Sequence, residues 1–199
     1  YLADYMAASE TAKRTIVRNC KFQPIARVVQ HDEAKVFISK FVRDRNPDIR
    51  PLTEEARRLR QRMADSDFDR DLFDHNADYI DRFAKVYPSL ILPEADLLAA
   101  GKAPAITLNG AKVTAEIQFR IRRLTKTNKV RLGAAMLRYA KGKPLPASVG
   151  EWQSAFLFGY LRLTDTEEGA EPEHDLCLTI DAYSVAIHPA PTNSTRRFQ

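Results

Sequence analysis

The chain has little cysteine and no long apolar run. Its two cysteines, Cys20 and Cys177, lie far apart and form no C-x-x-C pair, which fits a reducing compartment better than a disulfide framework. The longest apolar run, residues 155–161, is far shorter than the roughly 20 residues of a membrane-spanning helix. The first residues carry no basic segment followed by an apolar core, so no signal peptide is expected. We therefore expect a cytoplasmic protein with no membrane partner.

Motifs that mark common enzyme classes are also missing. The sequence contains no G-x-S-x-G, no Walker A motif and no G-x-G-x-x-G, and its four histidines show no H-x-x-x-H spacing. A metal site with histidine and cysteine ligands is therefore not predicted. Without these motifs a role without catalysis or cofactor is favoured, but the enzyme question stays open, with a nuclease that uses Mg²⁺ or Mn²⁺ as the alternative.

The composition is that of an ordinary globular protein. Apolar residues make up 44% and charged residues 29% of the 199 residues, which argues against general disorder. A chain of this length can bury a sizeable core in one compact unit. The net charge of +5 suits an anionic partner without identifying it.

The first half of the chain has a helical pattern. Apolar residues recur at spacings of three and four up to residue 91, which predicts a series of helices. Their expected starts are Ser9, His31 or Asp32, Thr53, and Ser66 or Asp67, and the second and fourth have clear apolar faces. In the first helix, Ala12, Ile16 and Val17 are expected to face inward.

The pattern changes to a period of two at Pro104. Ile106 to Ile121 alternate around Asn109-Gly110, which predicts a β-hairpin with a two-residue turn. Residues 130–139 read as a further strand. Ser148 is a predicted cap for an apolar helix ending near Leu163. Six acids without Lys or Arg predict an exposed acidic loop at 165–175, followed by a last strand at 176–188.

These elements predict an α+β protein. A helical N-terminal half, residues 1–92, packs on a small mixed β-sheet with a central apolar helix, residues 104–190, in a hairpin-strand-helix-strand core. Residues 191–199 are expected to form a tail.

Positive charge is concentrated in residues 112–143. This segment holds ten Lys or Arg against one acid, Glu116, so the rest of the chain is net acidic. Strand alternation places Arg120, Arg122 and Arg131 with the turn lysines in one working cluster, and it excludes Arg138. The predicted nucleic-acid-binding residues, which would contact backbone phosphates, are Arg120, Arg122, Arg123, Lys126, Lys129 and Arg131. Phe119, Tyr139 and Tyr183 are candidates for base stacking, although core packing is favoured for Phe119.

The element order, with Gln153 and Tyr160 in the apolar helix, resembles the RecB-like branch of the PD-(D/E)XK nuclease superfamily. The resemblance implies an aspartate in the hairpin and a D/E-x-K in the next strand, which hold Mg²⁺ or Mn²⁺. Here the corresponding stretches read Glu116-Ile117-Gln118 and Leu137-Arg138-Tyr139-Ala140-Lys141. The resemblance therefore implies a relative without the catalytic acids.

Three functions remain open from the sequence. The leading hypothesis is a non-catalytic nucleic-acid-binding protein that uses the basic β-hairpin and binds DNA rather than RNA. The first alternative is a divalent-metal-dependent nuclease that uses Glu116, Asp181 and Lys141. The second is a subunit of a larger complex, with the acidic loop at 165–175 contacting a protein partner.

Overall fold

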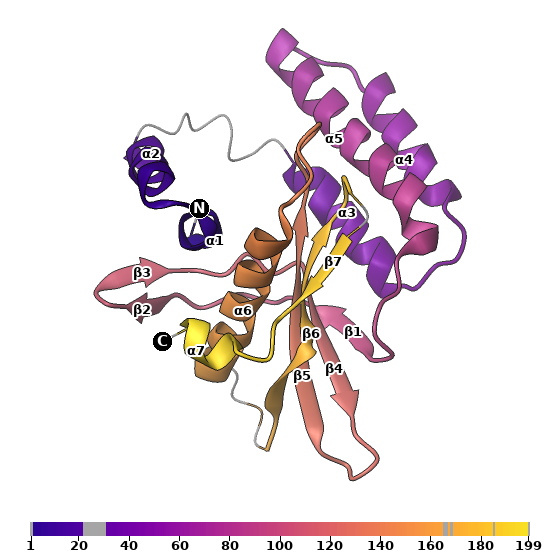
Figure 1. The fold of residues 1–199 in the computed structure, drawn as a ribbon. Coiled ribbons are helices and arrows are strands. Elements are labelled where there is room, and N and C mark those ends of the chain that lie inside the picture. The colour runs from indigo at the N-terminus through magenta and orange to yellow at the C-terminus, as the bar shows by residue number, and fades with distance from the viewer. Residues whose placement is uncertain (1, 22–30, 165–166, 168, 185, 199) are drawn as a thin grey trace.

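The computed structural model describes residues 2–21, 31–164, 167, 169–184 and 186–198. Helices occupy the N-terminal half and strands prevail from residue 96 onward, so the predicted α+β class is confirmed (Figure 1). The helices are α1 (Leu2–Ala7), α2 (Glu10–Lys21), α3 (Asp32–Arg43), α4 (Arg50–Gln61), α5 (Asp67–Val86), the short 3-10 helix η2 (Tyr87–Ser89), α6 (Ala147–Thr164) and α7 (Ser194–Phe198). Over the described residues, no helix has the length and apolar character that crossing a membrane requires.

The strands form a mixed five-stranded sheet and a separate hairpin. The large sheet has the order β1 (Asp96–Ala99), β4 (Phe119–Leu124), β5 (Val130–Arg138), β6 (Glu171–Asp181), β7 (Ala186–Pro189). Strands β5 and β6 run parallel and are connected by α6, whereas the other neighbours are antiparallel. The separate hairpin consists of β2 (Ile106–Leu108) and β3 (Ala111–Val113).

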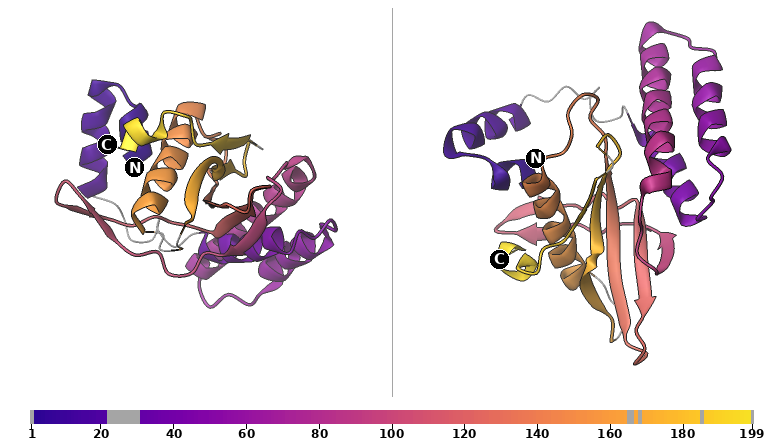
Figure 2. Two further views of the ribbon diagram at one scale, coloured as in Figure 1. Left: turned by 90° about the horizontal axis from the view of Figure 1, so that it is seen from below. Right: turned by 45° about the vertical axis from the view of Figure 1, so that its right-hand side comes forward.

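The sheet lies between two helical layers. Helices α3, α4 and α5 lie on one side of it, and α6 covers the other side (Figure 2, right). Both α1 and α7 contact α6 on the side away from the sheet. Helices α1 and α7 therefore lie on the same side of the molecule (Figure 1).

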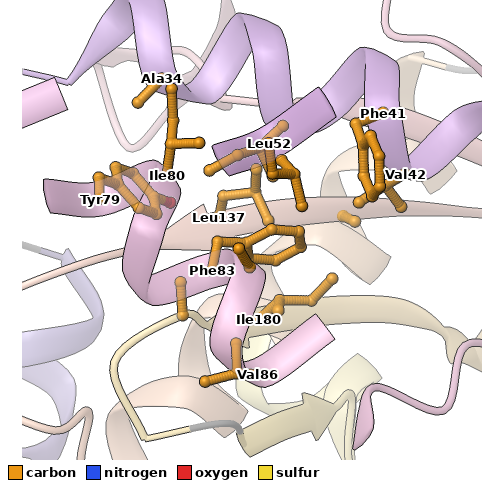
Figure 3. Packing of buried hydrophobic residues seen from close by; sticks show 14 of the residues in the cluster. Ala34, Phe41, Val42, Leu52, Tyr79, Ile80, Phe83, Val86, Leu137 and Ile180 are labelled. Carbon is orange, nitrogen blue, oxygen red and sulfur yellow. The ribbon is translucent and has the colours of Figure 1, made fainter. Parts of the chain in front are cut away.

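The larger core lies between α3–α5 and the sheet. Tyr79, Ile80 and Phe83 of α5 are fully buried against Leu137 of β5 and Ile180 of β6 (Figure 3). Burying one such side chain stabilises the fold by about 1.5–3 kcal/mol relative to leaving it exposed. The apolar face of α5, which the sequence predicted, thus packs the helical half against the sheet.

The start of α3 depends on a side chain from α5. His31, the residue before α3, makes no capping hydrogen bond with its side chain. Instead the Asn76 Oδ1 accepts a hydrogen bond of 2.8 Å from the Ala34 backbone N–H, and the Asn76 amide donates to the Leu72 carbonyl. Because free N–H groups at a buried helix start are costly, Asn76 stabilises the packing of α3 on α5.

The second core lies under α6. Leu157, Tyr160 and Leu161 pack against Ala134 of β5 and Cys177 of β6. The two strands approach closely beside Gly133, where an added Cβ would lie 2.0 Å from the Leu176 carbonyl oxygen. The parallel register is irregular here, because β5 advances from Leu132 to Ala134 while β6 advances from Pro172 to Cys177. Only glycine fits at this bulge.

Two expectations about the sheet need correction. The predicted second hairpin strand is not continuous: β3 ends at Val113, and β4 starts at Phe119 in the other sheet. The partner of β4 is β1, a short strand that the sequence did not reveal because its residues lack alternation. The Asn109-Gly110 turn is confirmed, and both residues have the positive φ that such turns require.

Expectations about helix ends also need correction. Thr53 and Ser148 lie inside α4 and α6 rather than at their caps, because each helix starts earlier at a proline-containing turn. In α2, Ala12 and Val17 are exposed instead of inward. Residues 194–198 form helix α7 on α6 rather than a tail, with Ser194 fully buried.

Candidate nucleic-acid interface

The predicted basic residues lie on one two-stranded ribbon. We call β4, β5 and their connecting turn, residues 119–138, the β4–β5 ribbon. Its turn lies at the free end of the sheet, beyond the helices (Figure 1). Backbone hydrogen bonds from Thr125 to Lys129 and from Asn128 to Thr125, both 2.9 Å, close this turn. Lys126 and Lys129 are exposed there, and neither side chain has a partner among the described residues.

The register of the ribbon divides the arginines between two faces. Arg123 lies opposite Arg131, and Arg122 lies opposite Leu132. Opposed residues share a face and neighbours alternate. Since Phe119 and Ile121 face α3–α5, Arg123 and Arg131 point to that side, whereas Arg120 and Arg122 point to the α6 side. The predicted cluster of Arg120, Arg122 and Arg131 on one face is therefore wrong, and Arg138 is the residue that shares the face of Arg120.

Acidic residues already pair with three of the ribbon arginines. The Arg122 Nη2 lies 2.8 Å from the Glu167 Oε1, and this hydrogen bond lowers the pKa of the Glu167 carboxyl. Arg123 pairs with Glu173, and Arg131 pairs with Glu171. The Nε of Arg120 donates to the Ala100 carbonyl at 3.2 Å. The ribbon thus remains basic, but three of its seven Lys and Arg side chains already pair with a carboxylate of the described residues.

The acidic segment is only partly the loop that its composition predicted. Glu171 and Glu173 belong to β6, which starts five residues earlier than expected, beside the basic strand β5. Residues 165, 166 and 168 lie outside the described part of the chain. Composition revealed the two opposite charge clusters separately, but it could not show that they contact each other.

The three residues of the nuclease hypothesis have separate partners. Asp181 is 1% exposed, and its carboxylate accepts hydrogen bonds from the backbone N–H groups of Leu145 and Tyr183 and from the Ser184 hydroxyl. Asp181 therefore connects the segment before α6 with the turn that follows β6. Lys141 pairs with Asp78 at 2.7 Å.

Glu116 is the third residue of that hypothesis. It pairs with Lys35 and accepts a hydrogen bond of 3.1 Å from the Gln118 amide. Over the described residues, no group of three or more His, Cys, Asp or Glu could hold a metal ion. The residues present therefore do not fit the Mg²⁺ or Mn²⁺ site that the nuclease resemblance implies, because such a site needs converging oxygen ligands.

The candidate stacking residues are already in contact with other rings or cations. Phe119 is fully buried in the core, as expected. Tyr139 stacks on Tyr79 with 4.5 Å between ring centroids. The guanidinium of Arg82 lies 4.9 Å from the ring centre of Tyr183. Base stacking is therefore not provided by these three rings in this arrangement.

The helix residues that carry the nuclease resemblance have different environments. The Tyr160 hydroxyl donates a hydrogen bond of 2.6 Å to the Pro104 carbonyl. Gln153 lines an open cleft together with Arg138. Comparison of the chain with models of protein families, with curated proteins and with solved structures found no match.

Proposed function

We propose that this protein binds nucleic acid without cleaving it, through the β4–β5 ribbon. The observation that carries the proposal is the free end of the ribbon, where Lys126 and Lys129 are exposed and unpaired among the described residues. The arginines at 120, 122, 123 and 131 lie behind them on both faces. Beyond Arg122 and Arg131 neither strand has a flanking strand, so the tip at residues 123–130 is a short antiparallel projection that can contact phosphates in a groove.

The shape of the two-stranded tip at residues 123–130 favours DNA over RNA. The major groove of B-form DNA is about 12 Å wide and admits a two-stranded β-ribbon. The major groove of A-form RNA is deep and too narrow for side chains to read. We therefore propose duplex DNA as the partner, with binding dominated by phosphates, and a cytoplasmic site of action.

The ion pairs on the ribbon are compatible with this function. Exposed salt bridges contribute only about 0–1 kcal/mol each, so a phosphate can replace a carboxylate beside an arginine. The carboxylates would then lower the affinity for DNA without abolishing it.

The two alternative functions have less support. A nuclease needs carboxylates that converge, and Glu116 and Asp181 have separate partners. The element order β4, β5, α6, β6 supports a distant relation to the PD-(D/E)XK superfamily in which the catalytic acids are lost. A subunit that docks through its acidic segment would have to replace the arginines of the same chain that pair with Glu167, Glu171 and Glu173.

A charge-reversal experiment tests the proposal. The double variant Lys126→Glu/Lys129→Glu should bind a short labelled DNA duplex more weakly than the parent protein in fluorescence anisotropy. Loss of two phosphate contacts should reduce the slope of log affinity against log salt by about 1.8. The matched control is Lys85→Glu/Lys102→Glu, which changes exposed lysines elsewhere by the same total charge. Equal weakening in both variants, or no binding by the parent protein, would reject the ribbon as the interface.

A further inference from the structure

A second site lies at the opposite end of β5 from the ribbon turn. An open cleft of about 1250 Å³ lies between α1, the β2–β3 hairpin, α6 and the end of β5. Eight residues of strand separate this end of β5 from Val130, which corresponds to roughly 26 Å. The cleft is therefore distinct from the tip of the ribbon.

The walls of the cleft are mostly apolar and partly open to solvent. Met136 and Phe156 contribute to its floor beside the second core. Leu2, Met6 and Leu163 also line it, and they remain 49%, 40% and 60% exposed. Apolar surface gathered in a concave site is typical of places that bind an apolar ligand.

The charged residues of the cleft include one cation that is unpaired. Lys35 pairs with Glu116, Arg162 donates to Thr195, and Arg197 pairs with Glu151. The half-buried guanidinium of Arg138 has no hydrogen bond or ion pair among the described residues. Since the cleft contains four cations and one acid, it is complementary to an anion.

Gln153 supplies a second unsatisfied polar group. It is 7% exposed, lines the same cleft, and its buried Oε1 has no hydrogen-bond partner. Its Nε2 carries two N–H donors, and an anion in the cleft can accept a hydrogen bond from them.

We propose that this cleft binds a long-chain acyl carboxylate. The carboxylate head accepts a forked pair of hydrogen bonds from Arg138 and one from the Gln153 amide. The acyl chain covers the apolar wall formed by Leu2, Met6, Met136, Phe156 and Leu163. Arg138 and Met136 lie at the end of β5 away from the turn, and no residue of the turn takes part.

A homologous series of ligands tests the apolar half of this site. Isothermal titration calorimetry of the full chain with octanoate, decanoate and dodecanoate should show affinity that rises two- to fourfold with each added CH₂. Dodecanol, which lacks the negative charge, should bind at least tenfold more weakly than dodecanoate. Affinity that does not depend on chain length, equal binding of dodecanol, or no binding of dodecanoate would overturn the proposal.

Two variants test the polar half. Arg138→Gln should weaken dodecanoate at least tenfold while leaving the weak binding of dodecanol unchanged, because it removes a charged hydrogen-bond donor. Gln153→Met should weaken dodecanoate severalfold with a similar side-chain volume. Arg57→Gln, an exposed arginine on α4, is the control with the same charge change. Unchanged dodecanoate affinity in Arg138→Gln would refute the site, and the ligand series on the parent protein decides the matter if that variant fails to fold.

Discussion

Removing the acids that pair with the ribbon should tighten DNA binding. In the triple variant Glu167→Gln, Glu171→Gln, Glu173→Gln, each side chain keeps nearly the same shape, but three arginines lose their carboxylate partners. The acidic side chains are 40%, 68% and 28% exposed, so the pairs belong to the weak, solvent-screened kind. A phosphate that displaces a carboxylate from its arginine must first break that pair. In the triple variant these ion pairs are absent, so phosphate binding does not require breaking them.

The size of the effect follows from the number of pairs. At about 0.2–1 kcal/mol for each exposed pair, three pairs amount to about 0.6–3 kcal/mol. This corresponds to roughly three- to 150-fold tighter binding. Fluorescence anisotropy with a labelled duplex, repeated between about 50 and 200 mM salt, measures the gain and the salt slope.

A matched control separates local pairing from total charge. Glu54→Gln/Asp65→Asn/Asp71→Asn removes the same number of negative charges from exposed positions away from the ribbon. We expect this control to gain much less affinity than the first variant. Equal gains would show that only net charge matters. Unchanged or weaker binding in the first variant would refute the role of the acids as competitors.

The remaining predictions concern stability. Burial, followed by the charges of Lys35 and His75, lowers the pKa of His31 from 6.5 to about 4. The unfolded chain therefore binds a proton as pH falls below 6.5 while the folded chain does not, so His31 destabilises the fold progressively from pH 6.5 toward 4. Urea unfolding at pH 7 and 5 should show a smaller loss in His31→Gln than in the parent protein, and parallel losses would contradict this. Asp181→Asn should lower the free energy of unfolding by about 2–3 kcal/mol, since a charged acceptor of three hydrogen bonds is lost, and should leave DNA affinity unchanged. If the parent protein cleaved DNA and Asp181→Asn did not, at an unchanged free energy of unfolding, the nuclease hypothesis would be favoured instead.

Local sequence patterns predicted the elements whose structure is determined locally. The helical spacing of Ala34, Ile38, Phe41 and Val42 identified the buried face of α3, because that spacing repeats along one side of a helix. The Asn109-Gly110 pair identified its hairpin because few other residues adopt positive φ there.

Features that depend on distant partners could not be predicted in this way. Arg123 and Glu173 are 50 positions apart, and the pairing of β4 with β5 and of β5 with β6 brings them together. The face of Arg131 depends on the register across a five-residue turn, which alternation within one strand does not determine. Asp181 looked like a candidate ligand because sequence does not show which backbone N–H groups it meets.

Chemical shift perturbation by NMR can locate the DNA-binding surface residue by residue. A uniformly ¹⁵N-labelled sample of the chain is titrated with a short DNA duplex at low salt. We expect the largest shifts at backbone amides of residues 122–131, which include the turn with Lys126 and Lys129. Shifts confined to other elements, or no shifts at all, would contradict binding through the β4–β5 ribbon.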